Sequence, residues 1–346
     1  MSLVRLKPLA APVFARLLGT GHPDEQTIQA SETEVVRPIG LIPGMLERVT
    51  RTDEHGELAY HLSRATATTI THAPVIRRIY RNALVQRTGF ATWRRNERYG
   101  KTRIGGALTR PILEFPEVRY CHSYVSWLYF GHWLTDAIPS ALIDPERGEI
   151  WMPPNASWGH APHYAGVFGL SVIEAELVIA SKLIVYQDFG QGSFKRARYA
   201  ILREQLHARF GGGDTVDCVY IRRGTTGVAR LITNELALLE QLTLRNWKVL
   251  DVAQATVEEM QRVLCKARIV VSIDGSHLAH AHLSLLPGCT MIVLVPHDRF
   301  VTVIADYCRA HDVLIGMVVL KGSLEEGYKA NLEEILRTID LTQKTY

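Results

Sequence analysis

The chain of 346 residues is longer than one compact hydrophobic core usually serves, so two domains of ordinary size are expected. Hydrophobic residues make up 47% of it and charged residues 21%, with only 15 prolines, and this composition excludes a disordered protein. The net charge of +4 is modest, and the longest apolar run, Leu283–Pro296, is too short for a membrane span and is broken by Pro287 and Gly288.

The N-terminus resembles a secretion signal only weakly. Arg5 and Lys7 precede an apolar patch, but Pro12 and Arg16 interrupt that patch and no clear cleavage site follows. The five cysteines are an odd number, are widely scattered and form no CxxC pair, which favours reduced thiols over disulfide bonds or a zinc site. Together these features predict a cytoplasmic protein.

A strongly basic stretch lies between Ile76 and Arg110, where ten basic side chains face one acid, Glu97. Such an excess is either a solvated and partly ion-paired surface or a docking patch for phosphates or an anionic membrane. Nucleic acid is disfavoured as a partner because no recognised binding motif accompanies the patch. The basic residues are Arg77, Arg78, Arg81, Arg87, Arg94, Arg95, Arg98, Lys101, Arg103 and Arg110.

The first 110 residues give few signals of secondary structure, because prolines break their short apolar stretches. The aromatic-rich segment Tyr120–Ile143 follows, and its second part has the spacing of a helix. If Phe130–Ile138 is helical, His132 and Asp136 lie four residues apart on one face. These two side chains would then be neighbours.

The boundary between the domains is expected in the polar, glycine-containing stretch Gln187–Ser193, after a buried strand at Leu177–Tyr186. The sequence thus predicts an N-terminal domain of residues 1–190 and a C-terminal domain of residues 191–346.

Strands and helices alternate regularly in the C-terminal half, which is typical of a Rossmann-like parallel sheet covered on both faces. The expected strands are Val216–Arg222, Trp247–Asp251, Arg268–Ile273, Thr290–Val295 and Val313–Val319, and the expected helices are Lys195–Phe210, Thr233–Leu244, Thr256–Lys266, Ser276–Leu285, Arg299–His311 and Leu324–Ile339.

Ligands of such sheets bind beyond the carboxyl ends of the strands. The first strand ends in Arg222 and Arg223, and Arg230 follows shortly before the helix that Asn234 and Glu235 help to open. Guanidinium groups at a strand end suit the charged oxygens of a diphosphate, which they bind bidentately. Alternatively, an arginine here pairs with Glu235 and only holds the loop.

The third strand of this half ends in a second candidate loop, Asp274–His277. Gly275 permits a tight turn and close backbone approach, and the free N–H groups at the start of the following helix would attract an anion. His277, His280 and His282 do not all share one helix face and no fourth ligand is evident, so a metal site is not expected.

Three motifs occur in the chain in a fixed order. The first is Phe130–Asp136 (FGHWLTD), the second joins Tyr220–Arg223 to Arg230 and an Asn-Glu pair, and the third is Val271–His280, which leads to a Leu-Pro-Gly turn and another strand. In this order and spacing they resemble the glycosyltransferases of family 61, over roughly Arg119–Tyr307.

The third motif departs from the pattern of that family. Asp274 stands where the family usually has His, Ser276 where it has Ala, and His277 where it has a small residue. His280 replaces an Asn. Because this loop should lie against the donor, these departures leave the identity of the donor open. They leave open even whether the reaction is the one that the family catalyses.

The resemblance implies an α/β fold of the GT-B type, with two Rossmann-like lobes and the active site in the cleft between them. The N-terminal domain would face the acceptor, and the C-terminal domain would hold a nucleotide-sugar donor. The expected donor-binding residues are Arg222, Arg223, Arg230, Asn234, Glu235, Asp274, Gly275, Ser276, His277 and His280.

The reaction implied is an inverting transfer, in which an acceptor hydroxyl attacks the anomeric carbon opposite the departing nucleoside diphosphate. It needs positive charge at the leaving group and a base, and Asp136 or His132 would be that base or would orient it. Alternatively, this pair only buttresses the surface of its domain. Because no Asp-x-Asp triplet occurs in the chain, neither a metal nor another cofactor is expected.

Two other functions remain open at this stage. An epimerase or hydrolase could share the donor lobe, and a non-catalytic protein could bind the nucleotide sugar as a sensor or assembly partner. The expected partners are the donor and a saccharide or lipid-linked acceptor, with peripheral contact to the inner face of the membrane through Arg77–Arg110. Surface polysaccharide synthesis, such as that of a capsule, is the setting that the resemblance implies for a bacterial protein.

Overall fold

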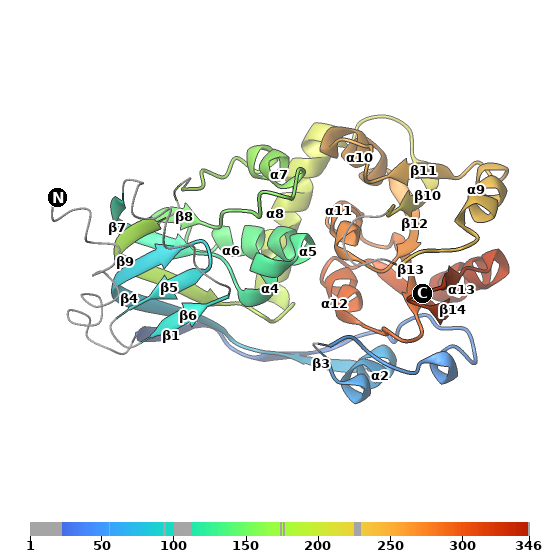
Figure 1. Ribbon diagram of the computed structural model, residues 1–346, viewed down its shortest axis with the longest axis horizontal. Coiled ribbons are helices and arrows are strands. Elements are labelled where there is room, and N and C mark those ends of the chain that lie inside the picture. Colours follow the sequence, from blue (N-terminus) through green and yellow to red (C-terminus); the bar gives the residue numbers. More distant parts are fainter. Residues whose placement is uncertain are drawn as a thin grey trace. The chain divides into compact units, whose positions relative to one another are not determined.

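The computed structural model describes residues 23–344 apart from residues 55, 93–94, 100–111, 174, 176 and 225–229. They form a mixed α/β protein whose chain divides into two compact units. Unit 1 contains Met1–Glu32 and His72–Gly190, and unit 2 contains Thr33–Thr71 and Gln191–Tyr346. Each unit is built on its own sheet (Figure 1).

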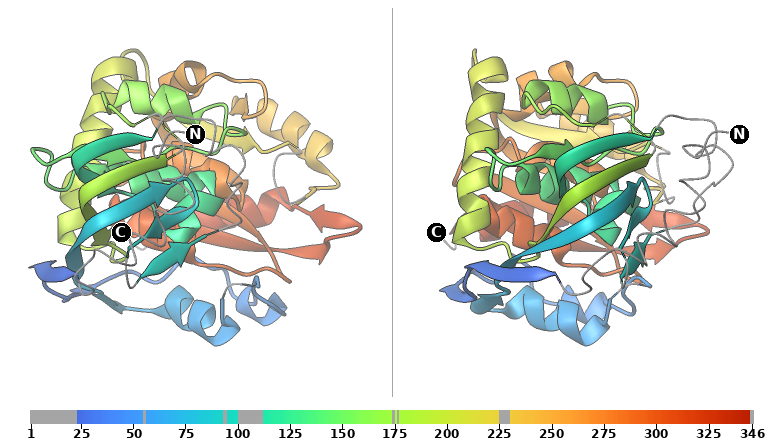
Figure 2. Two further views of the ribbon diagram at one scale, coloured as in Figure 1. Left: turned by 60° about the vertical axis from the view of Figure 1, so that its left-hand side comes forward. Right: turned by 90° about the vertical axis from the view of Figure 1, so that its left-hand side faces the viewer.

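Unit 1 has a mixed sheet in the order β6-β5-β4-β9-β7-β8, with β1 beside the first half of β4. Pairs along β4 are antiparallel, whereas β7 pairs in parallel with β8 and β9. Figure 2 shows β4, β9 and β7 side by side as long, twisted strands. The strands are β1 (Asp24–Gln29), β4 (Val75–Gln86), β5 (Gly89–Ala91), β6 (Asn96–Arg98), β7 (Leu113–Tyr120), β8 (Glu149–Trp151) and β9 (Leu177–Gln187).

This sheet is not the Rossmann-like lobe that the resemblance implied for the N-terminal half. Only Arg87 and Thr88 separate β4 from β5, and so short a connection can join only antiparallel strands, whereas a parallel pair needs a long crossover. An aromatic core covers the sheet: the Phe90 ring lies 5.2 Å from that of Tyr80 and 5.4 Å from that of Tyr120.

The predicted helix over Phe130–Ile138 is present but irregular. The N–H of Ile138 donates to the carbonyl of Trp133, five residues back, so η2 is one turn of π-helix. Pro139 has no N–H to give to the carbonyl of Thr135, which prevents a regular ladder there. The helices of unit 1 are α4 (Tyr124–Leu128), α5 (Phe130–His132), η2 (Trp133–Ala137), α6 (Ile138–Ala141) and α7 (Ala161–Val167).

Unit 2 has the sheet order β11-β10-β12-β13-β14-β15, in which all pairs are parallel except β14 with β15. Numbered from β10, the parallel strands follow the doubly wound order 2-1-3-4-5. All seven residues of β13 are buried, as expected for a strand covered on both faces. The strands are β10 (Val216–Arg222), β11 (Lys248–Asp251), β12 (Ala267–Ile273), β13 (Thr290–Pro296), β14 (Leu314–Ser323) and β15 (Gly327–Lys329).

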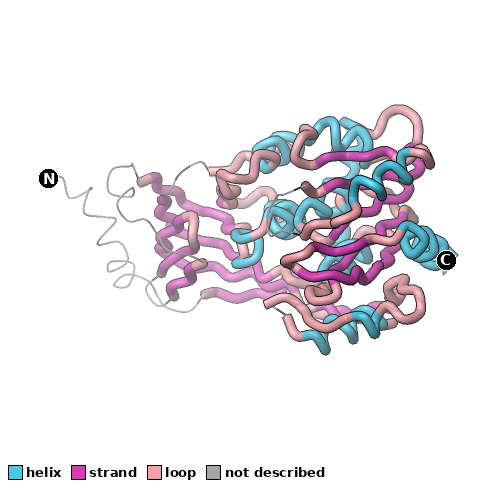
Figure 3. Tube along the Cα trace, turned by 45° about the vertical axis from the view of Figure 1, so that its right-hand side comes forward, coloured by secondary structure: helices cyan, strands magenta, loops and turns pink. Residues whose placement is uncertain are grey.

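Helices alternate with these strands along the chain (Figure 3), and in Figure 1 α11 and α12 lie on one side of them and α9 and α13 on the other. The parallel sheet predicted for this half is therefore confirmed. The helices are α8 (Ser193–Phe210), α9 (Glu235–Thr243), α10 (Val257–Leu264), η3 (Ser276–Leu278), α11 (Ala279–His282), α12 (Val303–Ala310) and α13 (Leu332–Lys344).

Two predicted helices of unit 2 differ from the structure. The helix expected at Ser276–Leu285 is two short pieces that end at His282. The helix expected from Leu324 begins only at Leu332, because the chain first forms a hairpin of β14 with β15. Gly327 has a φ of +85°, which a residue with a side chain rarely adopts, and this glycine starts the returning strand.

Residues 33–71 pack with unit 2, whereas the sequence placed them in the N-terminal domain. The N–H of Gly40 donates to Ile315 (2.9 Å) and its carbonyl accepts from Met317 (2.9 Å), so this segment adds a bridge to β14. Arg48 forms an ion pair with Glu334 of α13. The segment contains β2 (Glu32–Val35), η1 (Leu46–Arg48), α2 (Leu58–Thr66) and β3 (Thr69–His72).

All five cysteines are free thiols, as predicted. Within the described ranges, no helix is long and apolar enough to cross a membrane.

Candidate functional site

The candidate donor site lies at the carboxyl ends of β10 and β12. In the strand order 2-1-3-4-5 the direction of the connections changes between these two strands, and ligands of doubly wound sheets bind at that point. The two loops singled out in the sequence do meet here. Nη1 of Arg230 lies 2.8 Å from Oδ2 of Asp274 and also donates to the main-chain carbonyl of Asp274.

Arg222, at the end of β10, is held by two carboxylates. Its Nε donates to Oε2 of Glu235 (3.1 Å) and its Nη1 to Oδ2 of Asp251 (3.3 Å), while Tyr220 donates its hydroxyl to Oε1 of Glu235 (3.0 Å). The pairing of an arginine with Glu235, which the sequence left as an alternative, is therefore present. The Arg222 side chain is still 39% exposed, so one face of the guanidinium remains open to a ligand.

Arg223, the next residue, is buried, with 8% of its surface exposed. Its burial, with further repulsion from Arg230 and Arg299, lowers the pKa of Arg223 to about 10, although Asp274 partly opposes this. Around Arg223, two guanidinium groups disfavour its charge and one carboxylate favours it. An anion bound beside Arg223 would relieve the repulsion from Arg230 and Arg299, which makes this a favourable position for a diphosphate.

His277 is a neutral imidazole with a defined tautomer. Ser272 donates its only hydroxyl hydrogen to the carbonyl of Ile221 (2.6 Å), and its Oγ lies 2.8 Å from Nε2 of His277. His277 must therefore donate from Nε2, which leaves the lone pair on Nδ1. Burial, followed by the charges of Arg223 and Arg230, lowers the pKa of His277 to about 3.

Gly275 provides the close approach expected of it. A Cβ at this position would lie 2.9 Å from Nδ1 of His277 and 3.2 Å from Nε of Arg223, so any larger residue would displace one of these side chains. The glycine thus lets the loop after β12 pack against the arginine that follows β10.

The second candidate site is in unit 1, where His132 and Asp136 are neighbours as predicted. Nδ1 of His132 lies 2.7 Å from Oδ2 of Asp136, and both side chains are partly buried. A carboxylate accepts hydrogen bonds, so Nδ1 carries the proton and the lone pair of the neutral ring is on Nε2. This is the arrangement in which a carboxylate orients a histidine that acts as a base.

Residues 130–292 match the family model described as Glycosyltransferase 61, and this match includes the His132–Asp136 pair and the loops after β10 and β12. Over this segment the chain is similar to glycosyltransferase family 61.

No curated protein matches this chain. Solved structures similar to parts of it include a flavodiiron protein from Giardia intestinalis, with 9% identity and a TM-score of 0.25, over 48% of this chain and 42% of that one. Another is a mutant flavo di-iron protein from Thermotoga maritima, with 10% identity and a TM-score of 0.28, over 61% and 51%. The chain thus spans about half the length, or less, of these proteins.

The structure does not bring every predicted donor-binding residue to this site. The side-chain amide of Asn234 donates to and accepts from the main chain of Ala330 (2.8 and 3.0 Å), so it fixes the loop before α13. His280 is fully buried on α11, and its main-chain carbonyl accepts a hydrogen bond from the side-chain amide of Gln261 on α10. Ser276 is exposed beside Gly275.

Asp251 and Arg299 are site residues that the sequence analysis missed. Asp251 ends the strand parallel to β10, so the rule that ligands bind at carboxyl ends of strands could have found it. Arg299 follows β13 by a few residues, but only its effect on the pKa of Arg223 places it near the site. Among the residues with described positions, no three His, Cys, Asp or Glu side chains gather as metal ligands would.

The described arginines of the basic stretch are largely ion-paired. The acids come from distant parts of the sequence or from β6, which explains why the stretch itself looked unbalanced. The pairs are Arg77 with Asp144, Arg78 with Glu25, Arg81 with Asp24 and Arg95 with Glu97. Arg94, Lys101, Arg103 and Arg110 lie outside the described residues, as does the side chain of Arg98. Membrane contact therefore stays a prediction.

We expect the protein to lose stability in mild acid through buried histidines. Burial lowers the pKa of His122 to about 4 and that of His277 to about 3, and it lowers the pKa of His311 well below its usual value. An unfolded histidine has a pKa near 6.5, so below that pH the unfolded chain takes up protons that the folded chain refuses. Stability is then complete above about pH 6.5 and falls as the pH drops toward 4.

For His122 the loss at pH 5 is on the order of 2 kcal/mol, and it is similar for His277. Urea unfolding at pH 7.5 and pH 5 measures it. The variant His311→Phe should show a weaker pH dependence, because it removes one of these buried histidines. The two ring nitrogens of His311 have no hydrogen-bond partner in the described structure, so the variant loses no hydrogen bond of that ring. His163→Gln, at an exposed histidine of α7, is the control and should behave like the wild type. Equal unfolding midpoints at the two pH values would contradict the prediction.

Proposed function

We propose that this protein is a glycosyltransferase that moves a sugar, with inversion, from a nucleotide-sugar donor to a hydroxyl of an acceptor. The observation that carries the proposal is the group of guanidinium side chains around Arg223, at the point where the connections of the unit 2 sheet change direction. A nucleoside diphosphate is the leaving group that such a cluster suits, because its charge is concentrated on the diphosphate oxygens.

Unit 2 would hold the donor. Arg223 and Arg230 would contact the diphosphate, and Arg222 would offer its open face while Glu235 and Asp251 keep it in position. Glu235 and Asp251 are also acceptors for ribose hydroxyls. The neutral His277 would present Nδ1 as an acceptor to a hydroxyl of the donor.

Unit 1 would supply the base. Nε2 of His132 would take the proton of the acceptor hydroxyl while its oxygen attacks the anomeric carbon of the donor. The bond between that carbon and the diphosphate oxygen breaks, and its electron pair leaves with the nucleoside diphosphate. Asp136 would hold the imidazole and stabilise the positive charge that it gains.

The proposal keeps the two-lobed GT-B plan with one change, since only unit 2 is a doubly wound lobe. Surface polysaccharide or glycoconjugate synthesis, on the cytoplasmic side of a membrane, is the setting we propose for this transfer. The support is the family match over residues 130–292 together with the two sites.

The test is a thermal-shift screen of the purified protein against nucleotide sugars and nucleoside diphosphates, because a ligand of the folded state raises the melting temperature. The best donor is then incubated with and without a panel of saccharide acceptors. Donor consumption that requires an acceptor supports a transferase. Conversion of the donor alone would point instead to an epimerase or hydrolase, and binding without any turnover to a non-catalytic protein.

Transfer is expected to survive removal of divalent metal. The chain lacks an Asp-x-Asp triplet, and arginines stand where a metal would otherwise neutralise the diphosphate. Initial rates in excess EDTA should equal those in untreated buffer. Loss of turnover in EDTA that returns when Mn²⁺ or Mg²⁺ is added would contradict this prediction.

A further inference from the structure

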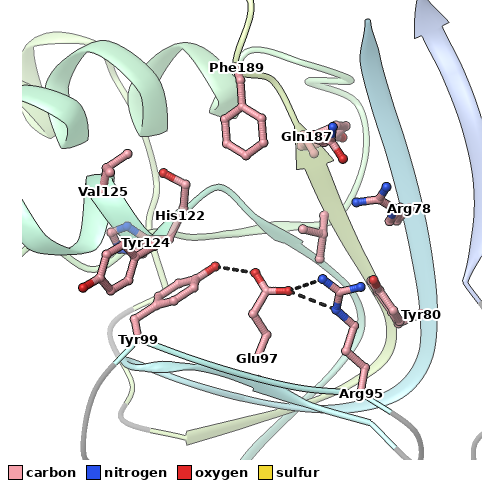
Figure 4. A pocket seen from close by; sticks show the side chains of 13 residues that line it. Arg78, Tyr80, Arg95, Glu97, Tyr99, His122, Tyr124, Val125, Gln187 and Phe189 are labelled. Atoms are coloured by element: carbon pink, nitrogen blue, oxygen red, sulfur yellow. Dashed lines mark hydrogen bonds and ion pairs between the residues drawn. The ribbon is translucent and has the colours of Figure 1, made fainter. Parts of the chain in front are cut away.

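Unit 1 contains a pocket that the proposed catalytic and donor residues do not use. Its volume is about 290 Å³, near the lower end of the range for small-molecule sites. It is lined from β4, from β6 and the residues beside it, from the end of β9 and from the start of α4 (Figure 4). The side chains that matter below are Tyr80, Tyr99, Tyr124 and Phe189, with Arg95 and Glu97.

Aromatic rings form much of the pocket wall. Tyr80 is buried and packs on Phe90, so it belongs to the rigid core of the unit. Tyr124 and Phe189 are 48% and 62% exposed, which is unusual for two large rings at one pocket. In Figure 4 the ring of Phe189 faces the pocket from the side opposite Tyr99 and Glu97. A flat apolar surface of a ligand could therefore be held between them.

Polar groups complete the wall opposite Phe189. Glu97 accepts from the hydroxyl of Tyr99 at Oε1 (2.8 Å) and from Nε and Nη2 of Arg95 at Oε2 (3.0 and 2.8 Å). Arg95 lies on the solvent side, and none of these contacts uses its Nη1. This planar network offers both donors and acceptors to a ligand with several hydroxyl groups.

The charges of the described pocket-lining side chains balance. Arg95 faces Glu97, and Arg78 donates from Nε to Glu25 (2.7 Å). His122 is neutral at physiological pH because burial lowers its pKa to about 4. Among the described lining side chains, a phosphate or a carboxylate ligand would find no excess positive charge. An uncharged ligand fits better.

Saccharides combine the two features that the wall offers. One face of a pyranose ring presents C–H groups that pack on aromatic rings, and its edge presents hydroxyls. We propose that this pocket binds an uncharged sugar residue of the acceptor glycan, stacked on Phe189 and Tyr124 and hydrogen-bonded to the Arg95–Glu97 pair. The term acceptor rests on the proposed function, whereas saccharide binding itself does not.

The experiment uses the full chain and calorimetry with three kinds of probe: neutral di- and trisaccharides, a digalacturonate, and an alkyl detergent without a sugar headgroup. A neutral oligosaccharide should bind the wild type, and Phe189→Ala or Tyr124→Ala should each weaken it about tenfold. Tyr60→Ala, which removes a ring that is 51% exposed on α2 of unit 2, is the matched control and should leave binding unchanged. Glu97→Gln tests the polar network and should weaken binding as well.

Three results would overturn the inference. The first is that no neutral oligosaccharide binds the wild type, and the second is that Phe189→Ala and Tyr124→Ala bind the oligosaccharide as tightly as the wild type does. The third is that the digalacturonate or the detergent binds more tightly than the neutral oligosaccharides. Nucleoside diphosphate affinity is measured for every variant and should not change. If the diphosphate binds and the saccharides do not, the inference fails while the proposed function stands. If saccharides bind and no nucleoside diphosphate or nucleotide sugar does, the proposed function fails and the pocket assignment stands.

Discussion

Replacing His132 with alanine is expected to lower kcat by about 10²–10⁴-fold, the usual contribution of a general base. The reason is that Nδ1 of His132 is engaged by Asp136 and the lone pair of the ring is therefore on Nε2, the atom that would take the acceptor proton. Donor affinity should stay the same, because the groups that would hold the donor belong to unit 2.

The variant Asp136→Asn refines this prediction. It keeps the base but removes the charge that orients it and stabilises the imidazolium, so kcat should fall less than in His132→Ala. His163→Ala, at an exposed histidine of α7, is the control. If His132→Ala retains wild-type kcat while folding normally, the pair only buttresses its helix and another group is the base.

The fold of unit 2 was predictable because strands and helices alternate regularly in its sequence and because its central strand β13 is a continuous apolar run that is buried throughout. Val216–Arg222 is a strand with the bounds predicted from the sequence. The hairpin before α13 was not predictable, since the Glu-rich residues around Leu324 have high helix propensity and the turn depends on the backbone conformation of Gly327. At this hairpin the long-range pairing of β14 with β15 determined the structure, and the local helix propensity did not.

Unit 1 was less predictable for the same reason. Strand β1 pairs residues 24–29 with residues 75–79 of β4, and no local pattern indicates which distant segment will supply the partner. The charge balance of β4 followed from that pairing, because Asp24 and Glu25 neutralise arginines that looked unpaired in the sequence. The pocket near Phe189 was invisible in the sequence because four separate segments line it.

The positions of the donor loops were predictable, because they follow the carboxyl ends of β10 and β12. Which of their side chains are exposed and which are buried was not predictable. Arg222 and Arg223 are adjacent, and adjacent residues at a strand end point to opposite faces. One is therefore partly exposed between two carboxylates and the other is buried among arginines. Likewise, nothing in the sequence distinguished Asn234, which fixes Ala330, from the residues that line the site.

We expect Arg223→Met to weaken nucleoside diphosphate binding by about 2–3 kcal/mol, or roughly 30- to 150-fold, the range for hydrogen bonds to charged groups. The structural reason is that burial and the charges of Arg230 and Arg299 destabilise the Arg223 guanidinium in the absence of an anion. Binding of the diphosphate would compensate that charge, and methionine fills a similar volume without it. The same substitution should leave the melting temperature of the unliganded protein unchanged or raise it, because the repulsion is gone.

Calorimetry with nucleoside diphosphates and thermal unfolding without ligand measure the two halves of this prediction. Arg268→Met is the matched control: Arg268 is an exposed, ion-paired arginine at the amino end of the same sheet, 3.6 Å from Asp217, and should not affect affinity. Arg222→Ala should have a smaller effect than Arg223→Met, since Glu235 and Asp251 already neutralise Arg222. A variant Arg223→Met that binds the diphosphate as tightly as the wild type would remove this arginine from the donor site. Reduced binding together with a large fall in melting temperature would show instead that Arg223 stabilises the fold.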